Sequence, residues 1–329
     1  MSLSLPELAV TRAPDVESAI AARGREPTSR FLAGGTDLLV NLRRGLGRPA
    51  LLIDLTAVDE LRELSIGANG IRIGACLTLA ALAETSAIRD RYRAVAEATA
   101  QIAGTATRSL ATVGGNLCLQ TRCIYYNQSE WWRRSNHYCL KHQGNVCHVA
   151  PQGQHCHAAF SGDLAPALLV LDAEVELAGK TGRRRLPLAD LYREDGRDHL
   201  AIDADEILVA VQLPGDPPIS GYAKARTRSA IDFPLAGAAV ALALDNGRLT
   251  LLRVALTGTN SRPFRLEGTE SLLGRALDAA AFQQLESLVQ KQVQPMRTTT
   301  AAAYYRRLVA CALVRKLAGT LAARSETPS

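Results

Sequence analysis

The sequence predicts a protein of mixed helices and sheets that is divided into two parts. Three observations carry this prediction. Strand and helix signals alternate along the first third of the chain. Turn residues then cluster at 214–218, where Pro-Gly-Asp-Pro-Pro is too rich in turn formers for a regular element. Beyond this boundary, two apolar runs and two helical patterns predict a second set of strands and helices.

Before the boundary, apolar residues at helical spacing predict helices, and short apolar runs predict strands. The segment Gly-Ala-Asn-Gly at 67–70 predicts a hairpin turn between two of these strands. Helices are expected over 14–23, from Leu38 onward, over 79–85 and over 91–102, and strands at 31–32, 51–55, 64–66, 71–73, 168–177 and 207–213.

The second part begins with a strong hairpin signal. Apolar runs at 238–244 and 249–256 are joined by Asp-Asn-Gly-Arg, and Asn-Gly favours a tight hairpin turn. Two helices follow, and apolar residues at i, i+3 and i+4 from Tyr305 to Leu317 mark the second. Cys311 lies in this helix and is expected to be a small buried hydrophobe.

Composition limits the class of protein. The 329 residues allow two or three core-bearing units, and 47% hydrophobic with 21% charged residues is ordinary for a globular protein. No apolar run reaches the roughly 18–20 residues that span a bilayer, and no secretory signal pattern opens the chain. We therefore expect a cytoplasmic protein that does not enter a membrane. A net charge of +6 without a long basic stripe does not favour a nucleic-acid partner.

One segment departs from this ordinary composition. Four of the seven cysteines, five of the six histidines and both tryptophans lie between Cys123 and His157. Cysteine and histidine are ligands of soft and borderline metals, so the segment is typical of a metal or iron–sulfur module. The odd number of cysteines and their clustering do not fit a secreted disulfide framework. Zinc stays open as the metal, because five histidines could complete a Cys2His2 or Cys3His site: His137, His142, His148, His155 and His157.

Two glycine pairs predict close backbone approach to a ligand. Gly34-Gly35-Thr36-Asp37 ends a strand and opens a helix, which lets backbone N–H groups face an anion such as a pyrophosphate. The segment 112–116, Thr-Val-Gly-Gly-Asn, offers a second such surface. Each pair taken alone is equally well explained as a tight turn. Neither matches G-x-G-x-x-G, so a Rossmann dinucleotide site is disfavoured.

Three motifs together resemble the FAD-binding subunit of the molybdenum hydroxylases. They are Leu-Ala-Gly-Gly-Thr-Asp-Leu-Leu at 32–39, Ala-Thr-Val-Gly-Gly-Asn-Leu at 111–117 and Ser-Gly-Asp-Leu-Ala-Pro-Ala-Leu at 161–168. The family includes xanthine dehydrogenase and the medium subunit of carbon monoxide dehydrogenase, and the resemblance covers nearly the whole chain.

The resemblance implies an α+β fold. Residues 1–216 would form an FAD-binding domain with subdomains at about 1–56 and 57–216, interrupted by an insertion at 117–162. Residues 217–329 would form a smaller C-terminal flavoprotein domain, built of an antiparallel sheet and helices.

The resemblance also implies how FAD is held. Two turns would surround its pyrophosphate, Asp163 would hold the ribose or adenine side, and Lys224 would lie near the isoalloxazine edge. A cation at that edge would stabilise the reduced flavin and raise its potential. The alternatives are a solvated lysine and, for Asp163, a helix N-cap. The full set is Leu32, Ala33, Gly34, Gly35, Thr36, Asp37, Thr112, Gly114, Gly115 and Asn116 at the pyrophosphate, Ile102 and Ala103 against the cofactor, Ile207 or Leu208 on the ring, Asp163 and Lys224.

The insertion departs from the usual family pattern, in which a short connection follows the Gly-Gly-Asn turn. It resembles the insertion of the 4-hydroxybenzoyl-CoA reductases, which carries an additional [4Fe-4S] cluster. The resemblance assigns the ligands to Cys123, Cys139, Cys147 and Cys156, although C-x15-C-x7-C-x8-C matches no common ferredoxin run. Cys118 is the competing cysteine, and we discount it because it continues the Gly-Gly-Asn-Leu turn.

The expected function is electron transfer, with no catalytic residue on this chain. The resemblance implies a molybdopterin-bearing large subunit and a [2Fe-2S] small subunit as partners, in a dimer of heterotrimers. Ferredoxin would donate electrons, which would pass through [4Fe-4S] and FAD to the partner subunits for reductive dehydroxylation. The main alternative is a carbon monoxide or xanthine dehydrogenase-like FAD subunit with a zinc-binding insertion. A flavin-free scaffold and a stand-alone flavin oxidase are further alternatives.

Overall fold

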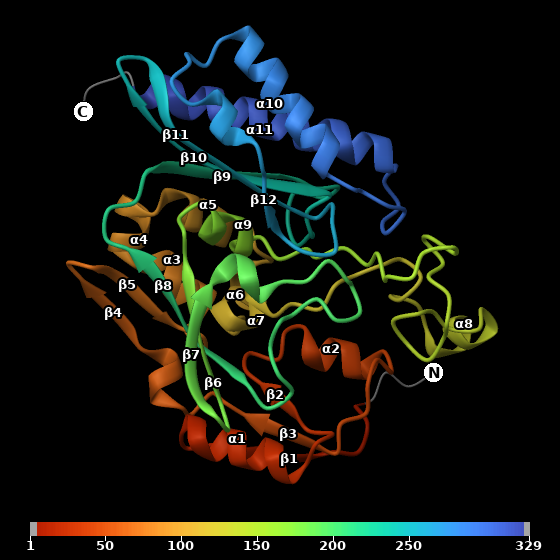
Figure 1. The fold of residues 1–329 in the computed structure, drawn as a ribbon. Helices are drawn as coiled ribbons and strands as arrows, with labels where there is room; N and C mark the ends of the chain where they lie inside the picture. The colour runs from red at the N-terminus through yellow and green to blue at the C-terminus, as the bar shows by residue number, and fades with distance from the viewer. Residues whose placement is uncertain (1–4, 326–329) are drawn as a thin grey trace.

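The computed structural model describes residues 5–325 and arranges them around three sheets (Figure 1). The expected domains also include residues 1–4 and 326–329, which lie outside the described residues. The division expected at residue 216 falls in the connection between two of the sheets and stays a prediction.

The N-terminal sheet is parallel, with strand order β1-β3-β2. Its strands are β1 (Ala9–Arg12), β2 (Arg30–Leu32) and β3 (Leu51–Asp54). The crossover helix α1 (Val16–Arg25) starts at Asp15, whose carboxylate accepts a hydrogen bond from Ser18 N at 2.7 Å. After β2, the chain turns through the first glycine pair into α2 (Leu38–Arg43). These elements agree with the expected alternation of strands and helices.

The central sheet has five antiparallel strands in the order β4-β5-β8-β6-β7. Its principal core packs the sheet against short helices, while a 3-10 turn, η1 (Asp59–Arg62), leads into the expected hairpin. The strands are β4 (Leu64–Gly67), β5 (Gly70–Gly74), β6 (Glu174–Gly179), β7 (Gly182–Pro187) and β8 (Ile207–Pro214), and the helices are α3 (Leu79–Glu84), α4 (Ser86–Arg91), α5 (Arg93–Gln101), α6 (Thr105–Arg108), α7 (Val113–Leu117) and α9 (Leu164–Leu169), with η2 (Leu188–Leu191) after β7.

The strand expected over 168–177 is wrong in its first half. Helix α9 runs to Leu169, and the strand begins only at Glu174. Between them Asp172 adopts φ 52°, a left-handed conformation that ends the helical path. All of α9 is buried, so its apolar residues give no amphipathic period, and a buried helix cannot be told from a buried strand by sequence alone.

The C-terminal sheet is antiparallel, with strand order β12-β11-β10-β9. The expected hairpin is confirmed as β10 (Ala236–Asp245) and β11 (Arg248–Thr257), which β9 (Ile219–Ala225) and β12 (Phe264–Arg265) flank. Figure 1 shows α10 (Ala279–Gln292) and α11 (Ala303–Ser325) over one side of this sheet, with η3 (Thr269–Leu272) leading toward them, while α5 and α9 contact its strands from the other side. Within residues 5–325, no helix has both the length and the hydropathy to cross a membrane.

The insertion leaves the central domain through a narrow neck. Arg122 and Ala159 exchange two backbone hydrogen bonds of 2.8 Å, which bring the ends of the segment together. Figure 1 shows the segment around α8 (Glu130–Ser135) at one side of the molecule. Most of it is irregular, and Cys123, Tyr126 and Cys156 share a small core cluster with Leu46 from outside the insertion.

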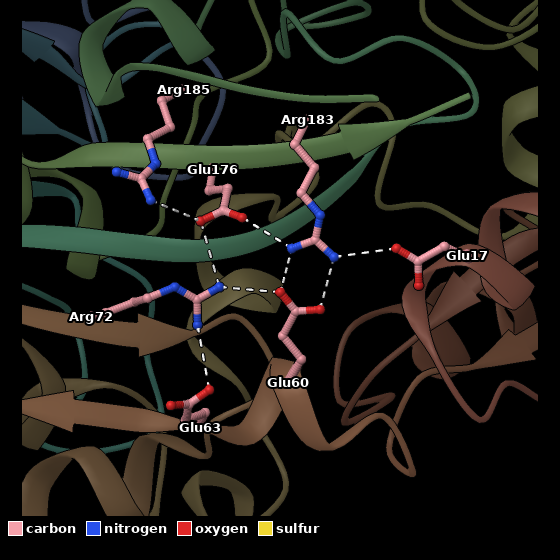
Figure 2. A network of polar contacts seen from close by, with 7 residues as sticks. All are labelled: Glu17, Glu60, Glu63, Arg72, Glu176, Arg183 and Arg185. Atoms are coloured by element: carbon pink, nitrogen blue, oxygen red, sulfur yellow. Dashed lines mark hydrogen bonds and ion pairs between the residues drawn. The ribbon is translucent and has the colours of Figure 1, made fainter. Parts of the chain in front are cut away.

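A network of charged side chains joins the N-terminal elements to the central sheet (Figure 2). Arg183 on β7 forms ion pairs with Glu60 and, at 3.3 Å, with Glu17 of α1. Arg183 also lies 3.1 Å from Glu176 of β6, which Arg72 of β5 approaches at 3.5 Å. Arg183 and Arg72 thus each contact carboxylates from different elements, since Arg72 also lies 3.4 Å from Glu60. The outer members of the network are Glu63 and Arg185.

Candidate flavin and metal sites

The first glycine turn needs both glycines for reasons internal to the protein. Gly35 has φ +71°, a conformation that L side chains rarely adopt. A Cβ on Gly34 would lie 1.8 Å from Leu110 O, so this residue must be glycine for the turn to pack on the 110–111 backbone. Both glycines are therefore required by the tight turn itself. The packing of Gly34 on Leu110 also places the first glycine turn beside the segment that leads into the second glycine turn.

The second turn starts α7. The Thr112 hydroxyl accepts a hydrogen bond from Gly115 N at 3.1 Å, and Gly114 N donates to Ala75 O at 2.7 Å. A Cβ on Gly114 would lie 2.8 Å from the Ala75 side chain, whereas Gly115 is exposed. The Asn116 amide oxygen accepts from Leu164 N at 3.1 Å, which ties this turn to the start of α9.

Asp163 and Lys224 form a buried ion pair. Lys224 Nζ lies 3.0 Å from Asp163 Oδ2, and their side chains are 0% and 5% exposed, respectively. Tyr222 OH donates to the other carboxylate oxygen at 2.5 Å, and Lys224 also donates to Asp232 O at 3.1 Å. Burial raises the pKa of Asp163 and lowers that of Lys224, while each charge opposes the shift of the other. Lys224 is thus not a solvated lysine, and the Asp163 carboxylate does not cap α9.

The two residues therefore present one unit to a ligand. The resemblance had assigned them to different parts of FAD, and the structure brings them within hydrogen-bond distance. Their contacts with FAD, like those of the other residues predicted to bind it, stay predictions.

The apolar candidates lie in two places. Ile102 follows α5 and is buried, and Ala103 beside it has φ 48°. The Arg108 guanidinium holds this turn by donating to Ile102 O at 2.8 Å. Ile207 and Leu208 are adjacent on β8 and belong to different core clusters, as expected for neighbours on a strand. Only one of the two can therefore face a ring placed on one side of this sheet.

Asp37 links the first glycine turn to the insertion. Its carboxylate pairs with the buried Arg122 guanidinium and accepts from Asn41 Nδ2 at 3.0 Å. Arg122 also donates to Asn41 Oδ1 at 2.7 Å, and it directly precedes Cys123. A polar path of two residues thus connects the predicted pyrophosphate turn with the predicted metal ligands.

The four predicted cysteine ligands line one cavity. Cys123, Cys139, Cys147 and Cys156 are far apart in sequence, yet all four face the same space inside the insertion. Cys118 is not among the lining residues, which agrees with our discounting it, and burial raises its pKa to about 12. Burial also raises the pKa of Cys123 and of Cys156 to about 11, so a metal would have to displace protons to bind them.

The described residues do not form a ready site for a single metal ion. Between residues 5 and 325, no three or more His, Cys, Asp or Glu side chains are close enough to hold one ion. A zinc ion needs all its ligands within about 2.0–2.3 Å of one point. A four-iron cluster takes one thiolate on each iron, so it suits cysteines that surround a space without touching one another. The lining contains four cysteines and no carboxylate, which fits an iron–sulfur group.

Of the five histidines that kept zinc open, His148 lines the cavity. Its Nε2 donates to Tyr138 O, which leaves its Nδ1 able to bind a metal. His155 is exposed and lies 3.6 Å from Asp195. Trp131 is 64% exposed and does not line the cavity. The aromatic side chains that line the cavity are those of Tyr125 and Tyr126, together with His148.

Lys141 also lines the cavity, and it is one of three cations, with Arg122 and Arg133, that the sequence offers as compensating charge for four thiolates. Its ammonium donates to Thr121 O at 2.9 Å, to Gly196 O at 2.8 Å and to the Thr121 hydroxyl. Burial lowers the pKa of Lys141 to about 8, which thiolates at Cys156, Cys123 and Cys139 would oppose.

The chain at 193–199 braces the same site. Gly196 N donates to Cys156 O at 2.7 Å, and Cys156 N donates to Asp195 Oδ1 at 3.2 Å. These hydrogen bonds join segments that are far apart in sequence, so no local sequence motif predicts them.

Comparisons with known proteins identify the family. Residues 6–216 match the FAD binding domain in molybdopterin dehydrogenase, and residues 221–321 match the CO dehydrogenase flavoprotein C-terminal domain. The aldehyde oxidoreductase FAD-binding subunit PaoB of Escherichia coli K12 is 33% identical over 275 residues, covering 80% of this chain and 84% of that protein. The xanthine dehydrogenase FAD-binding subunit of Escherichia coli O157:H7 is 27% identical, covering 90% of this chain and 89% of its own.

A solved structure agrees with the fold. A chain of the reconstituted CO dehydrogenase from Oligotropha carboxidovorans superimposes with a TM-score of 0.80 at 24% identity, covering 98% of this chain and 99% of that one. The expected fold, an FAD-binding domain followed by a C-terminal flavoprotein domain, is confirmed. This chain belongs to the FAD-binding subunits of the xanthine dehydrogenase and CO dehydrogenase family of molybdenum hydroxylases.

Proposed function

We propose that this chain is the flavin and iron–sulfur electron-transfer subunit of a molybdenum-containing reductase complex. The observation that carries the proposal is the convergence of Cys123, Cys139, Cys147 and Cys156 on one cavity that no carboxylate lines. In this proposal, these cysteines hold a [4Fe-4S] cluster, and the two glycine turns with the Asp163–Lys224 pair hold FAD. In this proposal, substrate chemistry belongs to a molybdopterin-bearing partner.

The proposed partners follow from the family. A molybdopterin-bearing large subunit and a [2Fe-2S] small subunit would receive or supply the electrons, in a dimer of heterotrimers. Within this chain, the Asp37–Arg122 pair holds the flavin turn and the neck of the insertion together. The two redox sites would therefore keep a fixed relation, as electron exchange between them requires.

The finer proposal is a 4-hydroxybenzoyl-CoA reductase that draws electrons from ferredoxin. A reductive dehydroxylation needs low-potential electrons delivered toward molybdenum, so a second redox group on the flavin subunit has a use there. The insertion carries a net charge of +3, half of the +6 of the whole chain. Arg122 and Arg133 are buried in ion pairs, so the docking of an acidic donor such as ferredoxin rests on the family resemblance and not on this charge.

A second candidate is favoured by the names of the relatives. The similar subunits belong to an aldehyde oxidoreductase and a xanthine dehydrogenase. A dehydrogenase of that kind, with zinc in the insertion, would pass electrons outward through FAD. As to substrate, the comparisons favour this second candidate over the reductase.

Metal analysis of the purified complex distinguishes the two candidates. The proposal expects one FAD in the complex. It also expects four irons and four sulfides beyond those of the [2Fe-2S] subunit, and Cys139→Ser or Cys147→Ser should lose this additional iron and sulfide. Cys118→Ser is the matched control and should keep the iron, because Cys118 does not line the cavity. Zinc with no additional iron in the wild-type complex would refute the iron–sulfur proposal.

A turnover assay tests the direction of electron flow. Cys139→Ser should abolish reduction driven by ferredoxin, while a dye that reduces the flavin directly should still support turnover. Unchanged ferredoxin-driven activity without the cluster would show that this subunit does not receive electrons as proposed.

A further inference from the structure

Lys141 is the cation that faces the four-cysteine cavity. It lies two residues after Cys139, and its three ammonium protons are directed to Thr121 O, Thr121 Oγ1 and Gly196 O. The ammonium also lies 5.0 Å from the centre of the Tyr126 ring, which lines the same cavity. The ammonium is thus held by Thr121 and Tyr126 of the insertion and by Gly196 outside it.

No carboxylate neutralises this charge. Among the ion pairs formed by residues 5–325, none includes Lys141, and its hydrogen-bond acceptors are neutral. The neighbouring cations are paired, since Arg122 contacts Asp37 and Arg133 lies 2.7 Å from Glu130. A desolvated charge without an opposite charge is costly, so the anion that Lys141 lacks is expected from a ligand.

Arg306 shows why the cavity matters to this argument. It is also buried on neutral acceptors, donating to Leu235 O at 2.9 Å and to Met296 O at 2.8 Å. It lines no cavity with cysteines, and its role is to hold backbone turns together. Lys141 differs because four groups that become thiolates on metal binding share its cavity.

We propose that Lys141 is the fixed counter-charge of the metal centre and sets its midpoint potential. This inference rests on the proposed function. Four thiolates bring more negative charge than an iron–sulfur core neutralises, and reduction adds one more. A cation held beside them stabilises the reduced state and so raises the potential. Hydrogen bonds to Thr121 and Gly196 hold the ammonium in position beside the cavity.

The test is a redox titration of the purified complex, with the cluster followed by electron paramagnetic resonance and the flavin by absorbance. Lys141→Met removes the charge and keeps the apolar stem, and should move the cluster midpoint to a more negative potential while the flavin midpoint stays. Lys141→Arg keeps the charge and should leave the cluster near the wild-type value. Lys180→Met is the matched control, because Lys180 is 58% exposed and pairs with Asp205.

The midpoint potentials and the iron content of the variants decide whether Lys141 is the counter-charge. Equal cluster midpoints in Lys141→Met and the wild type would overturn the inference, as would equal shifts in the Met and Arg variants. If Lys141→Met binds FAD but no iron while Lys141→Arg binds both, the counter-charge role is supported through assembly. If both variants lose iron and keep FAD, Lys141 acts by packing, and the inference is wrong. A wild-type complex without the additional iron would instead refute the proposed function itself, before any variant is compared.

Discussion

Several of the residues predicted to bind FAD form ion pairs between segments that are far apart in sequence. Asp163 opens α9 and Lys224 lies on β9, so their ion pair joins the central domain to the C-terminal sheet. With side chains 5% and 0% exposed, neither charge has water to replace its partner. The pair therefore has a structural role as well as its proposed role beside the flavin.

Removing the lysine should reveal both roles. Lys224→Met leaves a buried carboxylate with only Tyr222 to bind it, and breaking such a pair typically costs about 3–5 kcal/mol. We expect a loss of unfolding free energy of that order in urea denaturation of the apoprotein. In protein reloaded with FAD, the flavin midpoint should fall, because a cation no longer favours the reduced ring.

The control is the double variant Lys224→Met with Asp163→Asn. It removes both charges, and it should recover part of the lost stability while the flavin midpoint stays low. If the single variant were as stable as the wild type, the ion pair would not be buried as described.

His199 gives the molecule a dependence on pH. Burial lowers its pKa to about 4, with Lys141 contributing, and Nε2 donates to Leu119 O at 2.9 Å. The unfolded chain has a His pKa of about 6.5, so between about pH 6.5 and 4 the unfolded state binds a proton that the folded state does not. The stability contributed by neutral His199 is complete above this window and is lost as the pH falls through it.

The His199→Gln variant keeps a side-chain donor and removes the titration. Between about pH 7 and 5, the wild type should lose about 2 kcal/mol more unfolding free energy than the variant. Urea denaturation of both proteins at several pH values measures this difference. Parallel pH profiles would show that His199 does not carry the dependence.

At the scale of elements, the charged network of Figure 2 holds α1 and η1 against the central sheet. Arg183 contacts carboxylates from three elements, while Arg185 pairs, within residues 5–325, with Glu176 alone, at 3.7 Å. Arg183→Met should cost about 1 kcal/mol at low salt, a small value because its side chain is 38% exposed. The cost should shrink in high salt. Arg185→Met is the matched control. If both variants lost the same unfolding free energy, the contacts of Arg183 with three elements would not add stability.

The sequence predicted most elements because each carries a local signal. The β10–β11 hairpin shows its Asn-Gly turn. Helix α11 was predicted as a helix, but its predicted apolar repeat does not mark the buried face, because Tyr305 and Leu308 are 52% and 43% exposed whereas Val314 is buried. The α9 and β6 region was partly missed, because a helix buried on all sides has no polar face to reveal its period. The pairing of β8 with both β5 and β6 joins strands far apart in sequence, so no local pattern contains it.

At the scale of the whole molecule, sequence resemblance placed the four cysteines together, and local chemistry did not. Their spacing matches no common iron–sulfur run, and the structure brings them together through irregular chain. The sequence offers Lys141, with Arg122 and Arg133, as compensating charge near the cysteines, but its hydrogen bonds to Thr121 and Gly196 and the bracing segment around Gly196 could not be predicted, since these contacts join separate segments of the chain. The Asp37–Arg122 pair was missed for the same reason.

The architecture also predicts that the insertion can be removed. Residues 124–157 belong to none of the three larger core clusters and share one small cluster with Leu46 and the residues at the neck. Since Arg122 and Ala159 are already paired, a loop of about four polar residues can join them. The shortened chain keeps the Asp37–Arg122 pair, both glycine turns and the Asp163–Lys224 pair.

We expect the shortened chain to fold and bind FAD with an unchanged flavin spectrum, no metal, and a lower thermal midpoint. The lower midpoint follows from lost contacts between the insertion and its host, such as Ile124 N to Thr298 O at 2.9 Å and Arg133 to Arg44 O at 3.1 Å. Flavin absorbance, metal analysis and thermal unfolding of the isolated subunit measure the three outcomes. A shortened chain that folds but cannot bind FAD would mean that the insertion forms part of the flavin site. The two redox sites would then be one structural unit and not a module added to a complete flavoprotein.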